Sequence, residues 1–220
     1  MPLSDIWPIL AAYAIGATPC GFLIAKLRGI DIRAHGSGNI GATNVLRVLG
    51  KPIGVFVLVL DVLKGLLPVL LAKAASEHSI VHILAAVATI LGHNYTFWLG
   101  FKGGKGIATS AGAMLPLIPI PLAVALSLWG LLFGITRYVS VGSIFAALSL
   151  PVTEGAVSAT RGRWDWPIFG FTVFLAVMAT WRHKTNIRRL LAGEEARFEP
   201  RKKKAEKDAP PTEDSQTSSS

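Results

Sequence analysis

The chain has 220 residues, of which 51% are hydrophobic and 16% charged, and its net charge is +9. Its mean hydropathy is +0.50, and since soluble domains carry roughly a quarter charged residues, an ordinary soluble domain is excluded. The charges are also unevenly placed, because 17 of the 35 lie in the last 39 positions. We therefore expect a membrane domain over residues 1–195 and a disordered, polar cytoplasmic tail over residues 196–220.

Charge-poor intervals predict the membrane-spanning helices, because about 20 apolar residues cross a bilayer core as a helix. In chain order these intervals are residues 6–25, 52–72, 78–101, 106–136, 138–153 and 166–181. The 31 residues of the fourth interval would make one helix of roughly 46 Å, which is too long for a single span. Pro116, Pro119 and Pro121 break it into two short helices. The prediction is an all-α, polytopic membrane bundle of about seven transmembrane helices.

The loop charges predict the orientation of this bundle. The loops around 26–51, 102–105 and 137, together with the tail, hold 18 Lys and Arg residues, whereas the other side holds Lys73, Arg161 and Arg163. Basic residues accumulate on the cytoplasmic side, so we expect the N-terminus outside and the C-terminus in the cytoplasm. Because this placement accounts for the net charge, and the basic residues of the tail lack interleaved aromatics, no nucleic-acid partner is expected.

Residues 35–50, HGSGNIGATNVLRVLG, form the first of four polar segments on the predicted cytoplasmic side. The glycines spell G-x-G-x-x-G, but no buried strand precedes them, so a dinucleotide site is excluded. Exposed N–H groups, hydroxyls and amides in a small-residue loop suit an anion. The candidate ligands are Ser37, Asn39, Thr43, Asn44 and Arg47. The alternative is an ordinary polar loop with turn glycines.

The second segment places two lysines around three glycines: Lys102, Gly103, Gly104, Lys105 and Gly106. A helix is expected to begin directly after them, so its free N–H groups and positive dipole end face the same place. The spacing is not that of a nucleotide-binding Walker loop. We predict a phosphate site without a nucleotide, the alternative being lysines that only mark topology.

The third segment contributes Ser140 and Ser143, and the fourth contributes His183 and Asn186, which are three apart and so neighbours on one helix face. Alone, each segment would be a helix end with snorkelling cations. Four such segments at one end of a small bundle predict one shared site for an anionic substrate and a lipid. A membrane carrier for a phosphorylated solute is the alternative, although a carrier needs polar groups at the midplane and on both faces.

These segments resemble the membrane-bound acyl-phosphate:glycerol-3-phosphate acyltransferases of bacteria. The likeness covers residues from about 3 to 195 and rests on four stretches: SGNIGATNVLR, GH followed by FKGGKGIAT, YVSVGS and RHKTNIRRLLAGEE. Thr96 and Val141 depart from the residues usual in the family, which are Pro and Leu. Neither departure replaces a polar site residue.

The resemblance implies an acyltransferase that moves a fatty acyl group from acyl phosphate to the 1-hydroxyl of glycerol 3-phosphate, with no cofactor and no metal. It implies a bacterial inner-membrane enzyme whose active site faces the cytoplasm, and a soluble partner that makes acyl phosphate. It also implies that Ser37 and Arg47 belong to the catalytic centre, that Lys102 to Gly106 bind glycerol 3-phosphate, and that His183 and Asn186 line the same pocket. The terminal glutamates would be structural.

Two points concern proton transfer and buried charge. We expect His183 to donate a hydrogen bond while the departing phosphate takes the proton, a substrate-assisted route that the resemblance favours. Asp61 and Lys64 stand three apart inside a predicted span, where a lone charge costs roughly 2.5 to 3.5 kcal/mol. We expect them to pair with each other or to line the pocket. Glu154 is either similar or the mark of a helix end.

Overall fold

The computed structural model describes residues 3–198, and in that range its regular structure is helical throughout. The α-helices are α1 (Ile6–Gly16), α2 (Cys20–Lys26), α3 (Ala42–Leu49), α4 (Lys51–Ala75), α5 (Ser79–Asn94), α6 (Ile107–Met114), α7 (Pro119–Thr136), α8 (Val139–Thr160), α9 (Trp166–Arg182) and α10 (Lys184–Leu191). Short 3-10 turns cover Leu3–Asp5, Ile32–Ala34 and Phe97–Leu99. The all-α prediction is therefore confirmed for the described part of the chain.

Among the described residues, five helical segments are long and apolar enough to cross a membrane. They are Ile6–Lys26, Lys51–Ala75, Ser79–Leu99, α7 and α8, and the shorter apolar helix α9 accompanies them. Helix α6 has only eight residues, about 12 Å at 1.5 Å per residue, and is too short to span by itself. It packs against α4, where a Cβ added to Gly65 would lie 2.0 Å from the Thr109 carbonyl oxygen.

The predicted helix bounds hold at the proline cluster and fail at two other places. Between α6 and α7 the chain breaks after Met114 and resumes at Pro119, as the prolines predict. The first predicted helix is two, α1 and α2, because a residue before proline, here Thr18, disfavours the α conformation. Helix α8 continues to Thr160, so Glu154 is not a helix end but a buried residue within the helix.

A buried ion pair from α4 contacts the break between α1 and α2. The Lys64 Nζ atom lies 2.7 Å from Asp61 Oδ1 and donates to the carbonyl oxygen of Thr18 at 2.8 Å. Both charged side chains are buried. The pairing expected of Asp61 and Lys64 is thus present, and the ammonium also donates to the Thr18 carbonyl at the helix break, which accepts from the Cys20 N–H at 3.0 Å as well.

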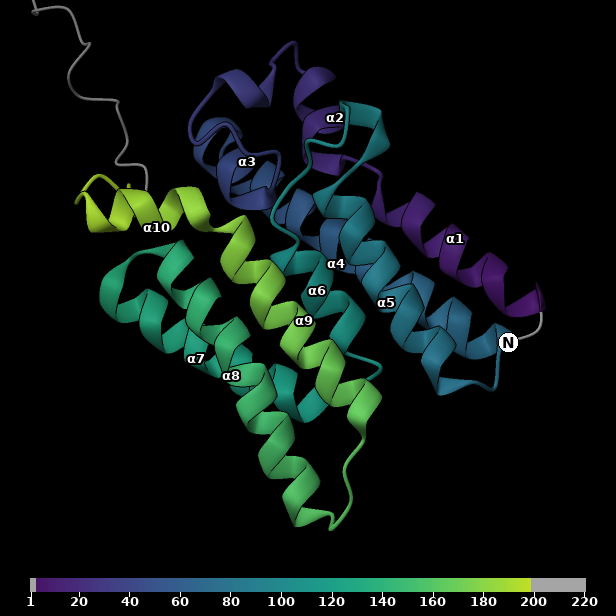
Figure 1. Ribbon diagram of the computed structural model, residues 1–220. Helices are drawn as coiled ribbons and strands as arrows, with labels where there is room; N and C mark the ends of the chain where they lie inside the picture. Colours follow the sequence, from purple (N-terminus) through teal and green to yellow (C-terminus); the bar gives the residue numbers. More distant parts are fainter. Residues whose placement is uncertain (1–2, 199–220) are drawn as a thin grey trace, which may run out of the picture.

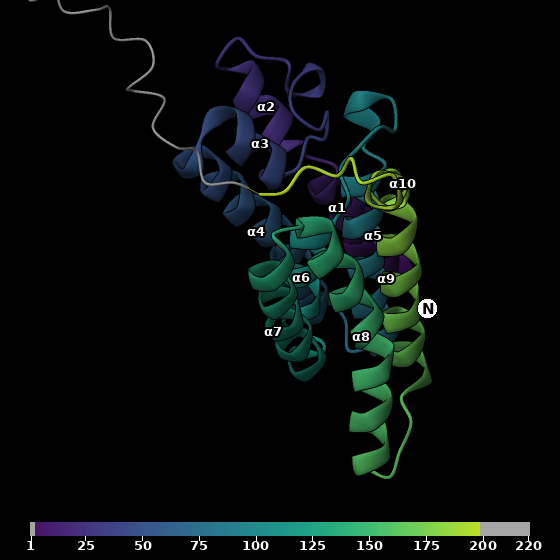
Figure 2. The ribbon, with the colours of Figure 1, turned by 90° about the vertical axis from the view of Figure 1, so that its left-hand side faces the viewer.

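The two ends of the bundle differ in character. Figures 1 and 2 show α2, α3, the segment after α5 and α10 gathered at one end, which we call the loop end. The connection between α8 and α9, residues 161–165, lies at the opposite end, the turn end (Figure 1). Between them an apolar core joins α5, α6, α8 and α9 through Ile90, Met114, Leu150 and Phe171. The first, second and fourth polar segments therefore lie at the loop end, and the third joins them through the Ser140 hydroxyl, which donates to Glu195.

The predicted boundary between membrane domain and tail lies near the end of the described chain. Residues 199–220, most of the predicted tail, are outside the described residues. Before them, the Phe198 N–H donates to the carbonyl oxygen of Arg137 at 2.8 Å, and the Arg197 Nε donates to the Tyr138 hydroxyl at 3.2 Å. The chain thus keeps contact with the bundle beyond residue 195.

Candidate active site

The glycine-rich loop after α5 folds back onto the end of that helix. The N–H groups of Gly103 and Gly104 donate to the carbonyl oxygens of Asn94 and His93, both at 3.1 Å. A Cβ on Gly104 would lie 2.1 Å from His93 Nε2, and Gly106 has a φ of +79°, which disfavours a side chain. These glycines are therefore needed for close approach of the backbone, as a phosphate loop requires.

Arg182, at the end of α9, fixes this loop from the other side. Its Nη2 donates to the Gly103 and Gly104 carbonyl oxygens at 2.9 and 2.7 Å, and its Nε donates to Gly104 at 3.0 Å. The guanidinium also lies over the Tyr95 ring, 5.2 Å from its centroid. Sequence reasoning did not place Arg182 in the site, although its position beside His183 was a signal for it.

A chain of hydrogen bonds then joins three of the four polar segments. The Lys105 Nζ donates to Asn186 Oδ1 at 2.6 Å, and Asn186 Nδ2 donates to Glu195 Oε1 at 2.7 Å. The Ser140 hydroxyl donates to the same Glu195 oxygen at 2.7 Å. Lys105, Asn186 and Ser140, all predicted site residues, are thus brought together, and Glu195 connects them.

The charges around Lys105 bring in the remaining segment. Burial lowers the pKa of Lys105 to about 8. The positive charges of Arg189, Arg182 and Arg47 act in the same direction, while Glu195 opposes them. Arg47 comes from α3, so the first polar segment contributes to the same electrostatic cluster. An anion placed here would relieve the repulsion among the cations.

His183 adopts a definite protonation pattern. Its Nδ1 lies 2.8 Å from the Ala179 carbonyl oxygen, which can only accept, so Nδ1 carries the hydrogen and Nε2 keeps a lone pair. Burial, with the charge of Lys105, lowers the pKa of His183 to about 4. At neutral pH the ring is uncharged, and its free nitrogen accepts. The expected donor role of His183 toward a phosphate oxygen does not fit this geometry.

The first polar segment is organised by Asn44. Its Nδ2 faces the carbonyl oxygens of His35 and Asn39 at 3.0 and 2.8 Å, and its Oδ1 accepts from the Ser37 N–H at 2.8 Å. The amide is buried and its hydrogen-bonding capacity is used within the loop. Asn44 therefore shapes the loop rather than facing a ligand. Its neighbours Thr43 and Arg47 are exposed, and Ser37 is half-buried.

Three other predicted residues either lie away from the hydrogen-bonded cluster or form hydrogen bonds within their own segments. Lys102 is exposed, and its ammonium has no polar partner within the described part of the chain. The Asn39 Oδ1 accepts from the Gly41 N–H at 2.8 Å. Ser143 faces the bundle interior, where its hydroxyl donates to the Val139 carbonyl oxygen at 2.8 Å.

Ser143 lines an apolar cavity of about 60 Å³ between α6, α7, α8 and α9. Its walls include Met114, Leu122, Leu126, Trp129, Leu150 and Leu175. One end is formed by Ile107, two residues after Lys105, and by Ala179, whose carbonyl oxygen holds His183. A polar, cationic cluster and an apolar cavity thus adjoin each other.

Fold and site together define a polytopic helical membrane protein with a cationic, glycine-rich loop at one end of its bundle. The family model described as glycerol-3-phosphate acyltransferase matches residues 6–193, and the chain belongs to that family. A glycerol-3-phosphate acyltransferase of Desulforamulus reducens is 46% identical over 194 residues, covering 88% of this chain and 94% of the relative. One of Geobacter sulfurreducens is 43% identical, covering 89% of this chain and 98% of the relative.

Solved structures agree with this membership. The crystal structure of PlsY, an integral membrane glycerol 3-phosphate acyltransferase, in its glycerol 3-phosphate form has a TM-score of 0.82 and 39% identity. It covers 89% of this chain and 96% of PlsY. The lysophosphatidic acid form of PlsY has a TM-score of 0.79 and 38% identity, with the same coverage. The resemblance expected from the sequence motifs is confirmed, and so is the membrane-embedded character of the fold.

Proposed function

We propose that the protein transfers a fatty acyl group from acyl phosphate to the 1-hydroxyl of sn-glycerol 3-phosphate. The products are 1-acyl-sn-glycerol 3-phosphate, or lysophosphatidate, and inorganic phosphate, which makes this the first acylation step of phospholipid biosynthesis. The observation that carries the proposal is the cationic cluster around Lys105 beside an apolar cavity. Family membership supports the acceptor, since relatives are named for glycerol 3-phosphate.

The phosphate groups of both substrates are assigned to the loop end. Lys105, Arg47 and the first free N–H groups of α6 offer charge and donors to the glycerol 3-phosphate. Ser140 and Asn186 add a hydroxyl and an amide, and the backbone of Gly103, Gly104 and Gly106 allows close approach. Ser37, Asn39 and Thr43 on the first loop, with Lys102, are proposed to complete the polar lining from the solvent side.

The carbonyl end of the acyl chain is assigned to the apolar cavity between α6, α7, α8 and α9, whose volume of about 60 Å³ suits only its first carbons. Its lining is aliphatic and aromatic apart from two serines, which suits a hydrocarbon chain. Because Ile107 and Ala179 close its end near Lys105 and His183, a chain seated there would leave its carbonyl carbon at the polar cluster. The two-part site thus matches a donor that is half lipid and half phosphate.

The reaction itself needs one bond formed and one broken. The 1-hydroxyl oxygen attacks the acyl carbonyl carbon, the bond from that carbon to the phosphate oxygen breaks, and phosphate leaves with the hydroxyl proton. His183 Nε2 is free to accept the hydroxyl hydrogen bond and so orient the nucleophile. The departing group is inorganic phosphate, whose oxygen carries the charge of the broken bond and is a stronger base than the His183 imidazole, with its pKa of about 4. The proton therefore prefers phosphate, which supports the substrate-assisted route.

The same reasoning assigns the cellular setting. We place the protein in the bacterial inner membrane with about seven spans, its N-terminus outside, and its loop end and C-terminus toward the cytoplasm, because Lys and Arg gather there. Both substrates carry phosphate and would reach the site from the cytoplasm. Acyl phosphate would come from a soluble partner enzyme that makes it.

The donor is tested with purified protein in detergent and labelled glycerol 3-phosphate. We expect lysophosphatidate to form from acyl phosphate without nucleotide, metal or carrier protein. Product from acyl-CoA, but none from acyl phosphate, would overturn the donor assignment. Binding of glycerol 3-phosphate without transfer from either donor would instead favour a carrier for a phosphorylated solute.

A further inference from the structure

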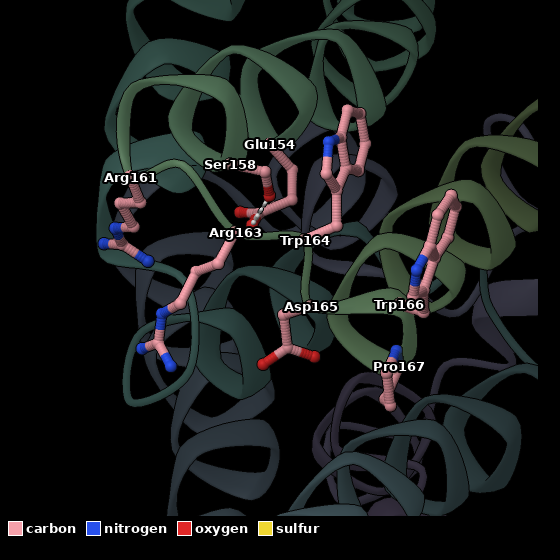
Figure 3. Close-up of a pocket in the computed structure, with 8 residues that line it drawn as sticks. All are labelled: Glu154, Ser158, Arg161, Arg163, Trp164, Asp165, Trp166 and Pro167. Carbon is pink, nitrogen blue, oxygen red and sulfur yellow. Dashed lines mark hydrogen bonds between the residues drawn. The ribbon is translucent and has the colours of Figure 1, made fainter.

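A second pocket, of about 250 Å³, lies at the turn end, opposite the loop end (Figure 1), and Figure 3 shows the residues that line it. It is formed by the last turns of α8, the connection after it and the start of α9. Its lining includes Glu154, Ser158, Arg161, Arg163, Trp164 and Trp166. Its volume approaches the lower limit of small-molecule sites, about 300 Å³. Nothing in the proposed reaction uses it.

At the bottom of this pocket lies a carboxylate without a cationic partner. Glu154 is only 3% exposed, and its Oε1 accepts a single hydrogen bond, from the Ser158 hydroxyl at 3.3 Å. Throughout residues 3–198 no Lys or Arg nitrogen forms an ion pair with it. Figure 3 shows both side chains reaching into the pocket from α8. A carboxylate removed from water needs such a partner, and an ammonium group would provide it.

The mouth of the pocket carries the opposite charge. Arg161 and Arg163 are exposed on the connection after α8 (Figure 3). Asp165 is also at the mouth, where its Oδ1 accepts from the Ile168 N–H at 3.1 Å and caps α9. Two carboxylates and two guanidiniums leave the pocket with no net charge. This pattern fits a zwitterion, with its cationic group inside and its anionic group outside, better than it fits an anion.

The aromatic residues place this pocket at the membrane surface and limit which kind of cation it can bind. Trp164 and Trp166 are 48% and 66% exposed, and exposed Trp at the ends of spanning helices lies at headgroup level. Their rings stack on each other, with centroids 5.4 Å apart, and Trp164 meets Phe169 edge-on. They do not form an open cage for a quaternary ammonium. The acceptors Glu154 and Ser158 instead suit a primary ammonium, which donates hydrogen bonds.

We propose that this pocket binds the headgroup of phosphatidylethanolamine from the adjoining leaflet. The primary ammonium donates to Glu154 and Ser158, and the lipid phosphate binds Arg161 and Arg163. The two tryptophans cover the glycerol region of the lipid. Two of the few basic residues on this side thereby have a ligand, although the charge rule of membrane loops would leave that side nearly free of them.

The test uses the full-length protein in detergent and native mass spectrometry with three lipids of equal acyl chains. These are phosphatidylethanolamine, phosphatidylglycerol and phosphatidylcholine. We expect phosphatidylethanolamine to be retained about tenfold more than either of the others, as one charged hydrogen bond allows. Glu154→Gln and Ser158→Ala each remove an acceptor of the ammonium and should abolish the preference, whereas Arg163→Ala removes a partner of the phosphate that all three lipids share and should lower the retention of each. Glu77→Gln, which removes an exposed carboxylate outside the pocket, should keep the preference.

Acyl transfer by each variant, measured without added lipid, checks folding and keeps this test separate from the proposed reaction. If Glu154→Gln does not fold, Ser158→Ala, a smaller change at the same ammonium site, decides the outcome. Equal retention of the three lipids by the wild type would overturn the proposal, and so would a preference for phosphatidylglycerol or phosphatidylcholine. A preference for phosphatidylethanolamine that survives both Glu154→Gln and Ser158→Ala would place the lipid elsewhere and overturn it too.

Discussion

The Lys105 ammonium, held by Asn186 in a partly buried position, links substrate binding to pH. Its pKa of about 8 means that it is charged at neutral pH and loses its charge as the pH rises through 8. Glycerol 3-phosphate stays a dianion over this range, because its second pKa is about 6. We therefore expect kcat/KM for glycerol 3-phosphate to fall roughly tenfold per pH unit above about 8. A pH profile of the purified enzyme measures this.

Two variants serve as controls for that profile. Lys105→Arg keeps its charge at all these pH values, so the fall near pH 8 should disappear, whereas Lys105→Ala should lower kcat/KM roughly 10- to 150-fold, as the loss of a charged hydrogen bond implies. Lys102→Ala changes an exposed lysine of the same loop and should have a smaller effect. A profile that keeps its inflection in Lys105→Arg would assign the titration to another group.

At the scale of single residues, the sequence predicted which side chains lie close together but not what each of them binds. Ser140, Lys105 and Asn186 were predicted as site residues, and they share one hydrogen-bonded chain. The ring orientation of His183 depends on the Ala179 carbonyl, which no side-chain pattern reveals. Likewise, Asn44 looks like a ligand in sequence, but its amide is used by the backbone of its own loop.

The glycine loop offers a test at the scale of an element. A Cβ on Gly104 would lie 2.1 Å from His93 Nε2, and His93 is buried and cannot move aside freely. Gly104→Ala should therefore shift the loop and its lysine. A displacement of about 1 Å can lower activity about 100-fold, so we expect kcat/KM to fall by 10- to 100-fold. Steady-state kinetics and a thermal melt of the same preparation measure the two effects.

The matched control for this variant is Gly130→Ala in α7. A Cβ there meets nothing within 4 Å, and alanine favours a helix more than glycine does. Activity should be unchanged, and the melting temperature equal or slightly higher. If Gly104→Ala also leaves kinetics unchanged, the close approach of loop and α5 does not position Lys105.

Element boundaries were predictable where local chemistry decides them. Prolines mark the break between α6 and α7, and a charge-poor interval marks α4. The end of α8 was missed because Glu154 looked like a terminal charge, whereas the bundle buries it within the helix. At the gap between α1 and α2 the local proline was visible in the sequence, whereas the hydrogen bond from the distant Lys64 ammonium to the Thr18 carbonyl was not.

For the molecule as a whole, Arg197 and Phe198, which we call the strap, lie across the turn between α7 and α8. The Phe198 ring packs edge-on against Phe133, at 5.6 Å between centroids, and Arg197 lies over the Tyr138 ring. Truncation after Glu199 preserves all these contacts, so insertion and activity should persist. Truncation after Glu195 removes them and should lower activity several-fold, because Glu195 then loses its anchor. Membrane fractionation and turnover of both proteins measure this.

Loss of activity in the protein truncated after Glu199 would show that residues beyond 199 contribute to function, and would contradict the prediction that the tail is dispensable. Equal activity of both truncations would show that the strap does not hold Glu195.

The membrane class of the whole molecule followed from composition alone, because too few charges remain for a soluble surface. One shared site was predicted from the common membrane side of the four polar segments, but the contacts that join them were not, since spacing along the chain does not say which helix ends meet.

Glu195 provides the cationic cluster around Lys105 with a carboxylate from the chain itself. Its carboxylate accepts from Ser140 and Asn186 and acts on Lys105, so it already meets the charge and hydrogen-bond donors that a phosphate would use. On the proposed function, a phosphate substrate would therefore enter by exchange, displacing the Glu195 carboxylate from these donors. The affinity for phosphate is then only the difference between two similar interactions. On the proposed function, such a site would keep its shape between turnovers and would release a phosphate product more readily than a bare cluster of cations.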